Sequence, residues 1–122
     1  MEKWIRRGDI YYIDRADYPH GSEQRGGRPA IIVSNNLNNR YSPTVEIVYL
    51  TTAPKKDLVT HVTIWGTKVK SIALCEQVTT VSKTRIGGYL GACSQREMER
   101  IDSAVMLSLG INAPAFVAGQ RD

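Results

Sequence analysis

Hydrophobic residues recur at helical spacing in one long segment of the sequence, from Ser94 to Gly110. Ser94 and Glu97 form the Ser-x-x-Glu pattern of a capping box at its start. The apolar positions then follow at intervals of three and four residues: Met98, Ile101, Val105 and Leu109. Gly110 ends the run, as glycine often does after the last turn of a helix. The segment is therefore predicted to form one amphipathic helix, and the chain before it has to fold differently.

Upstream of this helix, short runs rich in β-branched and aromatic residues alternate with glycine, proline and asparagine. In the clearest run, 45–51, Val45, Ile47 and Tyr49 alternate with Glu46, Val48 and Leu50. The other predicted strands are 8–14, 29–34, 61–65 and 71–81, with a turn at 66–70 and a short helical turn at 35–40. Gly87 and Gly88 are expected to separate Ile86 from a short pair formed by Tyr89 and Leu90. The pattern predicts a β-rich α+β fold, in which a small, strongly curved antiparallel sheet or barrel is closed by the C-terminal helix.

The length of 122 residues suits a single domain with its own core. We expect this domain to span residues 1–110, followed by a loosely ordered tail at 111–122. Two cysteines, Cys75 and Cys93, are too few for a disulfide framework and lack zinc-ligand spacing. The N-terminus has no apolar run long enough for a signal peptide or membrane span. These features predict a reduced cytoplasmic protein without a metal.

The net charge of +4 is concentrated in the middle of the chain. Residues 29–70 carry five basic and two acidic side chains, whereas 71–122 carry five of each. A positive surface near loops favours a phosphate-rich partner, because phosphate neutralisation releases counterions. Lysines also solvate loops, so charge alone leaves both interpretations open.

The sequence lacks the common catalytic motifs. Its only histidines, His20 and His61, form no HxxH or HExxH pattern, and no GxSxG, GxxxxGK or GxGxxG motif occurs. We therefore predict no metal and no cofactor. Cleavage of RNA through its own 2′-hydroxyl fits this inventory, since the substrate supplies the nucleophile. The protein has only to orient that oxygen and stabilise negative charge on the phosphoryl oxygens.

Several blocks, in order, carry a family resemblance: GDIYYID, GSEQRGGRPAIIVSNN, NRYSPTVEIVYLTT, ALCEQVTTVSKTRI and GYLG. They resemble the MazF/PemK family of toxin endoribonucleases over roughly residues 7–109. The resemblance implies a Src-homology-3-like, CcdB/MazF-like barrel that forms a homodimer. It also implies sequence-specific, metal-independent cleavage of single-stranded mRNA, leaving a 2′,3′-cyclic phosphate and a 5′-hydroxyl. The implied partners are a MazE-like antitoxin and, for the toxin–antitoxin complex, operator DNA; no membrane partner is implied.

The resemblance assigns the catalytic roles to Arg28 and Thr51. Arg28 is expected to stabilise the transition state, and Thr51 to bind a phosphoryl oxygen or orient the 2′-hydroxyl. A guanidinium loses its proton only above pH ~12, so arginine is a poor general base. Glu23 is a further candidate for the base, although it could equally be a solvated carboxylate or an ion-pair partner of Arg25 or Arg28. The glycines around these residues are expected to permit backbone conformations that other residues resist.

Further RNA-binding candidates come from the same blocks: Ser22, Gln24, Arg25, Glu76, Gln77 and Thr80. Glu76 could alternatively anchor a backbone amide. Where this chain has Ser22, Leu74 and Glu76, the PemK/Kid branch has a histidine, an arginine and an aspartate. These differences place the chain closer to the MazF branch and disfavour a histidine–aspartate mechanism.

Two alternatives come from other functional classes. The same barrel can act as a gyrase-binding toxin, which needs no catalytic arginine and threonine and uses its C-terminal helix. A noncatalytic member would keep the fold and the basic surface. The aromatic side chains of Tyr49, Trp65 and Tyr89 could either stack on RNA bases or pack in a core or interface, and the sequence leaves both roles open. Replacing Arg28 or Thr51 distinguishes these classes: activity that is lost indicates catalysis, whereas activity that persists favours one of the two alternatives.

Overall fold

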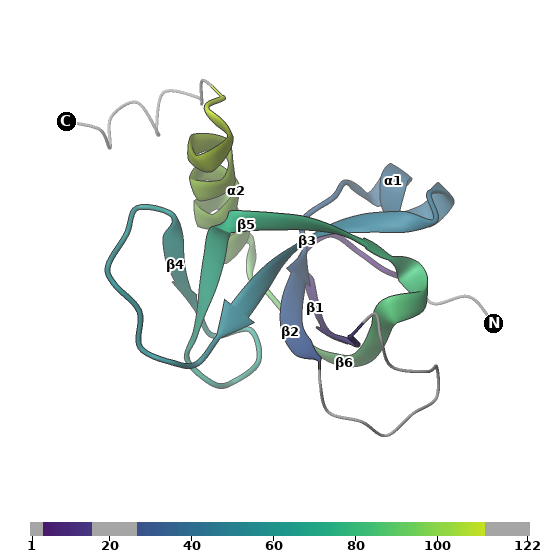
Figure 1. Cartoon of the computed structure of the whole chain (residues 1–122), viewed down its shortest axis with the longest axis horizontal. Coiled ribbons are helices and arrows are strands. Elements are labelled where there is room, and N and C mark those ends of the chain that lie inside the picture. The colour runs from purple at the N-terminus through teal and green to yellow at the C-terminus, as the bar shows by residue number, and fades with distance from the viewer. Residues whose placement is uncertain (1–3, 16–26, 112–122) are drawn as a thin grey trace.

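The computed structural model describes residues 4–15 and 27–111, which form one curved antiparallel sheet with a C-terminal helix (Figure 1). The sheet has six strands in the order β4-β5-β3-β2-β1-β6. The elements along the chain are β1 (Asp9–Ile13), β2 (Arg28–Ile32), α1 (Asn36–Tyr41), β3 (Thr44–Thr51), β4 (His61–Ile64), β5 (Ser71–Ser82), the 3₁₀ turn η1 (Lys83–Arg85), β6 (Ile86–Ala92) and α2 (Gln95–Leu109). The predicted β-rich α+β fold is confirmed. None of the helices in the described ranges is long and apolar enough to cross a membrane.

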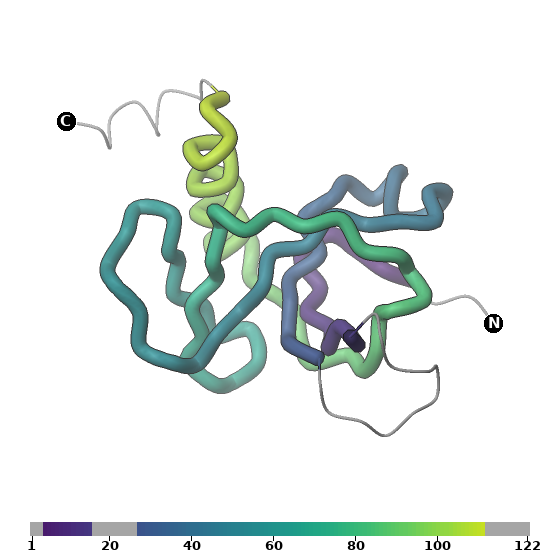
Figure 2. Tube along the Cα trace, viewed as in Figure 1, coloured from purple at the N-terminus to yellow at the C-terminus, as the bar shows by residue number. Residues whose placement is uncertain are grey.

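The two faces of β3 pack into two different cores, as its alternating pattern predicts. Val48 and Leu50 point to the core that α2 covers, together with Ile31, Ile64 and Ile101. The other face meets a second core on the opposite side of the sheet, which is formed by Ile5, Tyr11, Ile13, Ala30, Ile32, Val45, Ile47, Val81 and Ile86. A strongly bent sheet is needed to enclose a core on each side, and the trace in Figure 2 shows the chain curling back on itself.

β5 is long because it serves two neighbours. Its first part lies between β4, with pairs from His61↔Leu74 to Ile64↔Ser71, and the end of β3, whereas its second part pairs with β3 alone. Between the partners Leu50↔Ala73 and Val48↔Val78, four residues of β5, 74–77, stand opposite Tyr49 alone. Such an insertion bends a strand and redirects its side chains. The β5 insertion, 74–77, therefore lies beside the middle of β3.

Two glycines in β6 correct the expectation for this region. β6 runs without interruption through Gly87 and Gly88, so these residues do not separate two segments. A Cβ on Gly87 would lie 2.9 Å from the carbonyl oxygen of Tyr12. The glycine allows β1 and β6 to pack closely, which a reading of glycine as a chain breaker misses.

α2 has the predicted ends. The side chain of Ser94 accepts from the backbone N–H of Glu97, the Glu97 carboxylate accepts from the Ser94 N–H, and Gly110 adopts the left-handed conformation (φ 75°). Met98 and Ile101 are buried against the sheet. Leu109, predicted to continue this stripe, is 58% exposed, and the neighbouring Ser108 instead contacts the sheet, donating to the carbonyl of Cys75 at 3.0 Å.

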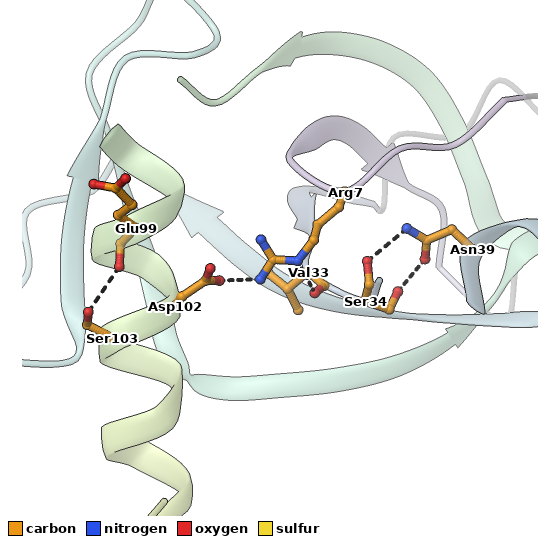
Figure 3. Close-up of polar contacts among 7 residues, drawn as sticks. All are labelled: Arg7, Val33, Ser34, Asn39, Glu99, Asp102 and Ser103. Atoms are coloured by element: carbon orange, nitrogen blue, oxygen red, sulfur yellow. Dashed lines mark hydrogen bonds and ion pairs between the residues drawn. The ribbon is translucent and has the colours of Figure 1, made fainter. Parts of the chain in front are cut away.

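Arg7 joins α2 to the end of β2 (Figure 3). Its Nε donates to the carbonyl of Val33 at 3.1 Å, and its Nη2 forms an ion pair with Asp102 of α2. Beyond Val33, the buried Asn39 of α1 donates to the carbonyl of Ser34 at 2.8 Å and accepts from the Ser34 hydroxyl. The polar groups at the end of β2 are thus satisfied from both sides.

Replacing Asn39 with alanine should lower the free energy of unfolding by about 2–3 kcal/mol, because Asn39 is buried and the partly buried carbonyl and hydroxyl of Ser34 each lose a partner. Urea denaturation followed by circular dichroism measures this. Val69→Ala is the control, since Val69 is 56% exposed and its truncation should cost under ~0.5 kcal/mol. Equal effects of the two substitutions would contradict the role given to Asn39.

Candidate active site

Arg28 is the first residue of β2, an inner strand of the sheet, and is exposed at the end of this strand. Its guanidinium carbon lies 4.4 Å from the ring centroid of Tyr49 on the neighbouring strand. A cation over an aromatic face is stabilised by the ring quadrupole, and stacking leaves the N–H groups at the rim of the guanidinium free to bind an anion. Tyr49, one of the aromatic residues left open above, therefore orients Arg28.

Thr51 ends β3 near Arg28. β2 and β3 pair with Ala30↔Tyr49, and this register continued by two residues brings Arg28 opposite Thr51. Both side chains lie on the face of Tyr49, because side chains alternate along each strand. The Thr51 Oγ1 accepts from the backbone N–H of Ala53 at 3.1 Å, which leaves its own hydrogen available for donation. The two catalytic candidates thus come together at one end of the β2–β3 pair.

Gly27, which precedes Arg28, is required for a different reason from the one expected. It is not among the described glycines with positive φ. A Cβ at this position would instead lie 2.1 Å from the carbonyl oxygen of Ile13. The glycine lets the chain enter β2 directly against the end of β1, and so sets the position of Arg28.

The β5 insertion supplies the candidates Glu76 and Gln77, both exposed. Val78 packs against the core under α2 and Val81 belongs to the second core. Cys75 and Val78 both pack against the core under α2, so the strict alternation of a regular strand does not hold between them. Glu76 and Gln77 lie in this irregular part of β5, opposite Tyr49.

Thr80 lies on the face of the sheet opposite to that of Tyr49. It pairs with Glu46 of β3, and its hydroxyl lies 2.7 and 2.9 Å from the two carboxylate oxygens of Glu46. Since Glu46 alternates with Tyr49 and Thr51, this pair points away from Arg28. The structure does not bring Thr80 together with the other described candidates.

Glu76 has a partner that the sequence analysis did not identify. Its Oε2 lies 3.1 Å from Nε2 of His61, while Nδ1 of His61 lies 2.7 Å from the carbonyl oxygen of Lys56. The hydrogen bond to Lys56, opposed by burial and supported by Glu76, raises the pKa of His61 above its ordinary value. Burial alone would raise the pKa of Glu76, but hydrogen bonds from its own N–H, from His61 and from Thr60 outweigh burial and lower this pKa. Fifteen residues separate the pair, so no local motif indicates it.

The remaining candidates, Ser22, Glu23, Gln24 and Arg25, lie outside the described residues. The two cysteines are free thiols, and burial raises the pKa of each to about 12. A thiol with such a pKa is a weak nucleophile at neutral pH. Arg28 and Thr51 therefore remain the catalytic candidates among the described residues.

Comparison with known proteins identifies the family. The family model for the PemK-like, MazF-like toxin of type II toxin–antitoxin systems matches residues 6–109. The chain belongs to the PemK/MazF toxin family. Endoribonuclease MazF from Staphylococcus epidermidis is 41% identical over 113 residues, covering 88% of this chain and 93% of that protein. This relative agrees with the assignment to the MazF branch.

Solved structures agree with this assignment. An endoribonuclease from Mycobacterial species, in complex with its cognate antitoxin, superposes with a TM-score of 0.77 at 28% identity, covering 90% of this chain and 99% of that one. The MazE–MazF structure (Form-II) from Deinococcus radiodurans superposes with a TM-score of 0.74, covering 91% of this chain and 100% of that one. At 15% identity the second likeness shows the shared MazF fold.

Proposed function

We propose that this protein is the endoribonuclease toxin of a type II toxin–antitoxin pair, which cuts single-stranded mRNA at a short sequence motif without a metal. The observation that carries the proposal is the placement of Arg28 and Thr51 on one face at neighbouring strand ends, with Tyr49 under the guanidinium. Family membership and the similar endoribonucleases support it.

In the proposed reaction the 2′-hydroxyl oxygen attacks the adjacent phosphorus. Its proton passes to a base, the bond from phosphorus to the 5′-oxygen breaks, and that oxygen takes up a proton. The products are a 2′,3′-cyclic phosphate and a 5′-hydroxyl. Arg28 binds the phosphoryl oxygens through its fixed fork of donors, and the Thr51 hydroxyl donates a further hydrogen bond to them. Glu23 remains the proposed base.

The first experiment is cleavage of a long single-stranded RNA by the purified protein in excess EDTA, with mapping of the fragment ends. Cuts at a recurring short motif with cyclic-phosphate ends are expected. Intact RNA in the presence of a folded protein would contradict the ribonuclease proposal and favour the gyrase-binding or noncatalytic alternatives.

We propose a MazE-like antitoxin as the protein partner in the cytoplasm. A disordered acidic segment of the antitoxin would compete with RNA for a basic groove, since both present negative charge. Operator DNA is a proposed partner of the toxin–antitoxin complex only. The observation that supports the antitoxin as partner is the similar endoribonuclease from Mycobacterial species, which was solved in complex with its cognate antitoxin.

We further propose that the protein is a homodimer. A cavity of about 660 Å³ lies between the N-terminal segment, α1 and η1, and three large side chains at its edge are exposed: Trp4 (63%), Leu37 (74%) and Tyr41 (73%). The guanidinium of Arg40 lies 4.5 Å from the Trp4 ring. Tryptophan, tyrosine and arginine are enriched where protein interfaces gain most of their binding energy. We propose this surface as the dimer interface.

Light scattering should give twice the chain mass of 13.6 kDa for the native protein, and Tyr41→Glu should shift the mass toward the monomer, because a buried unpaired carboxylate is costly. Val69→Glu is the control, since Val69 is 56% exposed but does not line this cavity. A monomeric native protein, or a Tyr41→Glu variant that stays dimeric, would contradict the proposed interface.

A further inference from the structure

His61 connects two segments that flank the candidate site. Segment 52–60 leaves Thr51 directly, and its Lys56 carbonyl accepts from Nδ1 of His61 at 2.7 Å. On the other side, Glu76 belongs to the β5 insertion opposite Tyr49 and lies 3.1 Å from Nε2 of His61. The imidazole is nearly enclosed, with 9% of its side chain exposed.

Both partners of His61 are hydrogen-bond acceptors. A neutral imidazole carries one N–H, so it can donate to the Lys56 carbonyl or to the Glu76 carboxylate but not to both. The imidazolium carries two N–H groups and satisfies both acceptors. The directions of the pKa shifts agree with this: the pKa of His61 is raised and that of Glu76 is lowered. Among charged groups, Glu76 favours protonation of His61 and Lys55 opposes it.

The position of this contact makes it relevant to the site. Thr51 is the last residue before segment 52–60, so the path of the segment affects the direction of the Thr51 hydroxyl. Ala53, which donates to that hydroxyl, belongs to the same segment. Gln77 follows Glu76 in the insertion, which lies opposite Tyr49. A displacement of either segment would therefore change the spacing between Thr51 and the β5 side of the site.

We propose that His61 is a positioning residue of the ribonuclease site, which in its doubly protonated form holds segment 52–60 against the β5 insertion and so fixes Thr51 relative to Gln77. This inference rests on the proposed function. His61 acts through Lys56 and Glu76 and takes no proton from the substrate.

The contact should weaken as pH rises. A histidine whose pKa is raised by folding contributes stability in full below its unfolded value near 6.5, and loses the contribution as pH rises through the folded pKa. Glu76, whose pKa is lowered, contributes in full above its unfolded value near 4.5. Both contributions are complete between about pH 4.5 and 6.5, and the histidine part declines above this window.

Two uncharged variants separate the halves of the contact. The amide nitrogen of asparagine occupies roughly the place of Nδ1, and that of glutamine the place of Nε2. His61→Asn therefore keeps a donor for Lys56, and His61→Gln keeps one for Glu76. Each variant should lower kcat for RNA cleavage roughly tenfold at pH 6, because small displacements of catalytic groups cost up to about a hundredfold.

The ratio of wild-type to variant kcat is measured from pH 5.5 to 8.5, so that the pH dependence of the chemical step cancels. The ratio should fall toward one as pH rises, while KM changes little. Amide exchange in segment 53–60 of the free variants should be faster than in the wild type. Circular dichroism confirms that both variants are folded.

Four results would overturn the proposed role of His61. A ratio that stays constant with pH would assign His61 a purely structural role. A rise in KM without faster amide exchange would make it a direct RNA contact. Wild-type protein that cleaves no RNA at any pH would remove the proposed function and, with it, this role. Active wild type with unaffected His61 variants would instead leave the proposed function intact.

Discussion

Arg28→Ala should lower the rate of RNA cleavage by roughly a thousandfold while the barrel remains folded. The guanidinium is exposed and its described contact is with the Tyr49 ring, so its removal leaves no buried group without a partner. Removing one donor that stabilises a transition-state charge costs about 10²–10³ in rate, and arginine offers more than one. Cleavage of a short RNA containing the mapped motif, followed under single-turnover conditions in EDTA, measures the loss.

Matched variants define the origin of this loss. Arg28→Lys keeps the charge but loses the fork of donors, so it should recover only part of the rate. Thr51→Val removes the hydroxyl at nearly constant volume and should be at least tenfold slow, whereas Thr51→Ser should retain activity. Arg100→Ala, which removes an exposed arginine of α2, is the charge control. Cleavage at the native rate by Arg28→Ala would contradict the placement of the active site.

Gly91→Ala should lower the free energy of unfolding by roughly 4 kcal/mol or more, a large fraction of the stability of a domain of this size. Gly91 in β6 has a φ of 151°, which side chains rarely adopt, and a Cβ there would lie 2.1 Å from the carbonyl oxygen of Gly66. In return, a Cβ on Gly66 would lie 2.6 Å from the carbonyl oxygen of Ala92. The turn after β4 and the end of β6 therefore have to separate if either residue gains a side chain.

Gly88→Ala in the same strand is the matched control. A Cβ on Gly88 would meet no atom within 4 Å, and its φ is not in the left-handed range. The substitution should change stability by less than ~1 kcal/mol, in either direction. Denaturant unfolding of both variants measures the difference, and similar midpoints would show that β6 moves away from the turn at little cost.

Local features of the fold were predictable because they depend on neighbours in the sequence. The capping box of Ser94 and Glu97 acts within one helical turn, and the alternation of Val45, Ile47 and Tyr49 follows from the pleat of a strand. The extent of packing was not predictable in the same way. Leu109 has helical spacing but is exposed, whereas the neighbouring Ser108 is the residue of this turn that contacts β5.

Some residues of the candidate site were likewise predictable from the sequence, whereas others were found only in the structure. Arg28 and Thr51 were assigned from a resemblance in their surrounding motifs, and those assignments stay predictions until tested. Tyr49 as the residue under Arg28, and His61 as the partner of Glu76, came from the structure. The second pair depends on the register of β4 against β5, which sets His61 opposite Leu74 and which the residues of β5 do not encode by themselves.

The sequence by itself determined the class of fold, the helix with its two ends and the faces of β3, because these follow from hydrogen bonds and side-chain periods within a few residues. It also carried the motifs by which the family is recognised. Only the tertiary structure decided that Gly27 lies against Ile13, that Gly91 lies against Gly66, and that the β5 insertion faces Tyr49. Close approaches and strand registers of this kind are set by the simultaneous packing of distant segments around two cores, which no local pattern specifies.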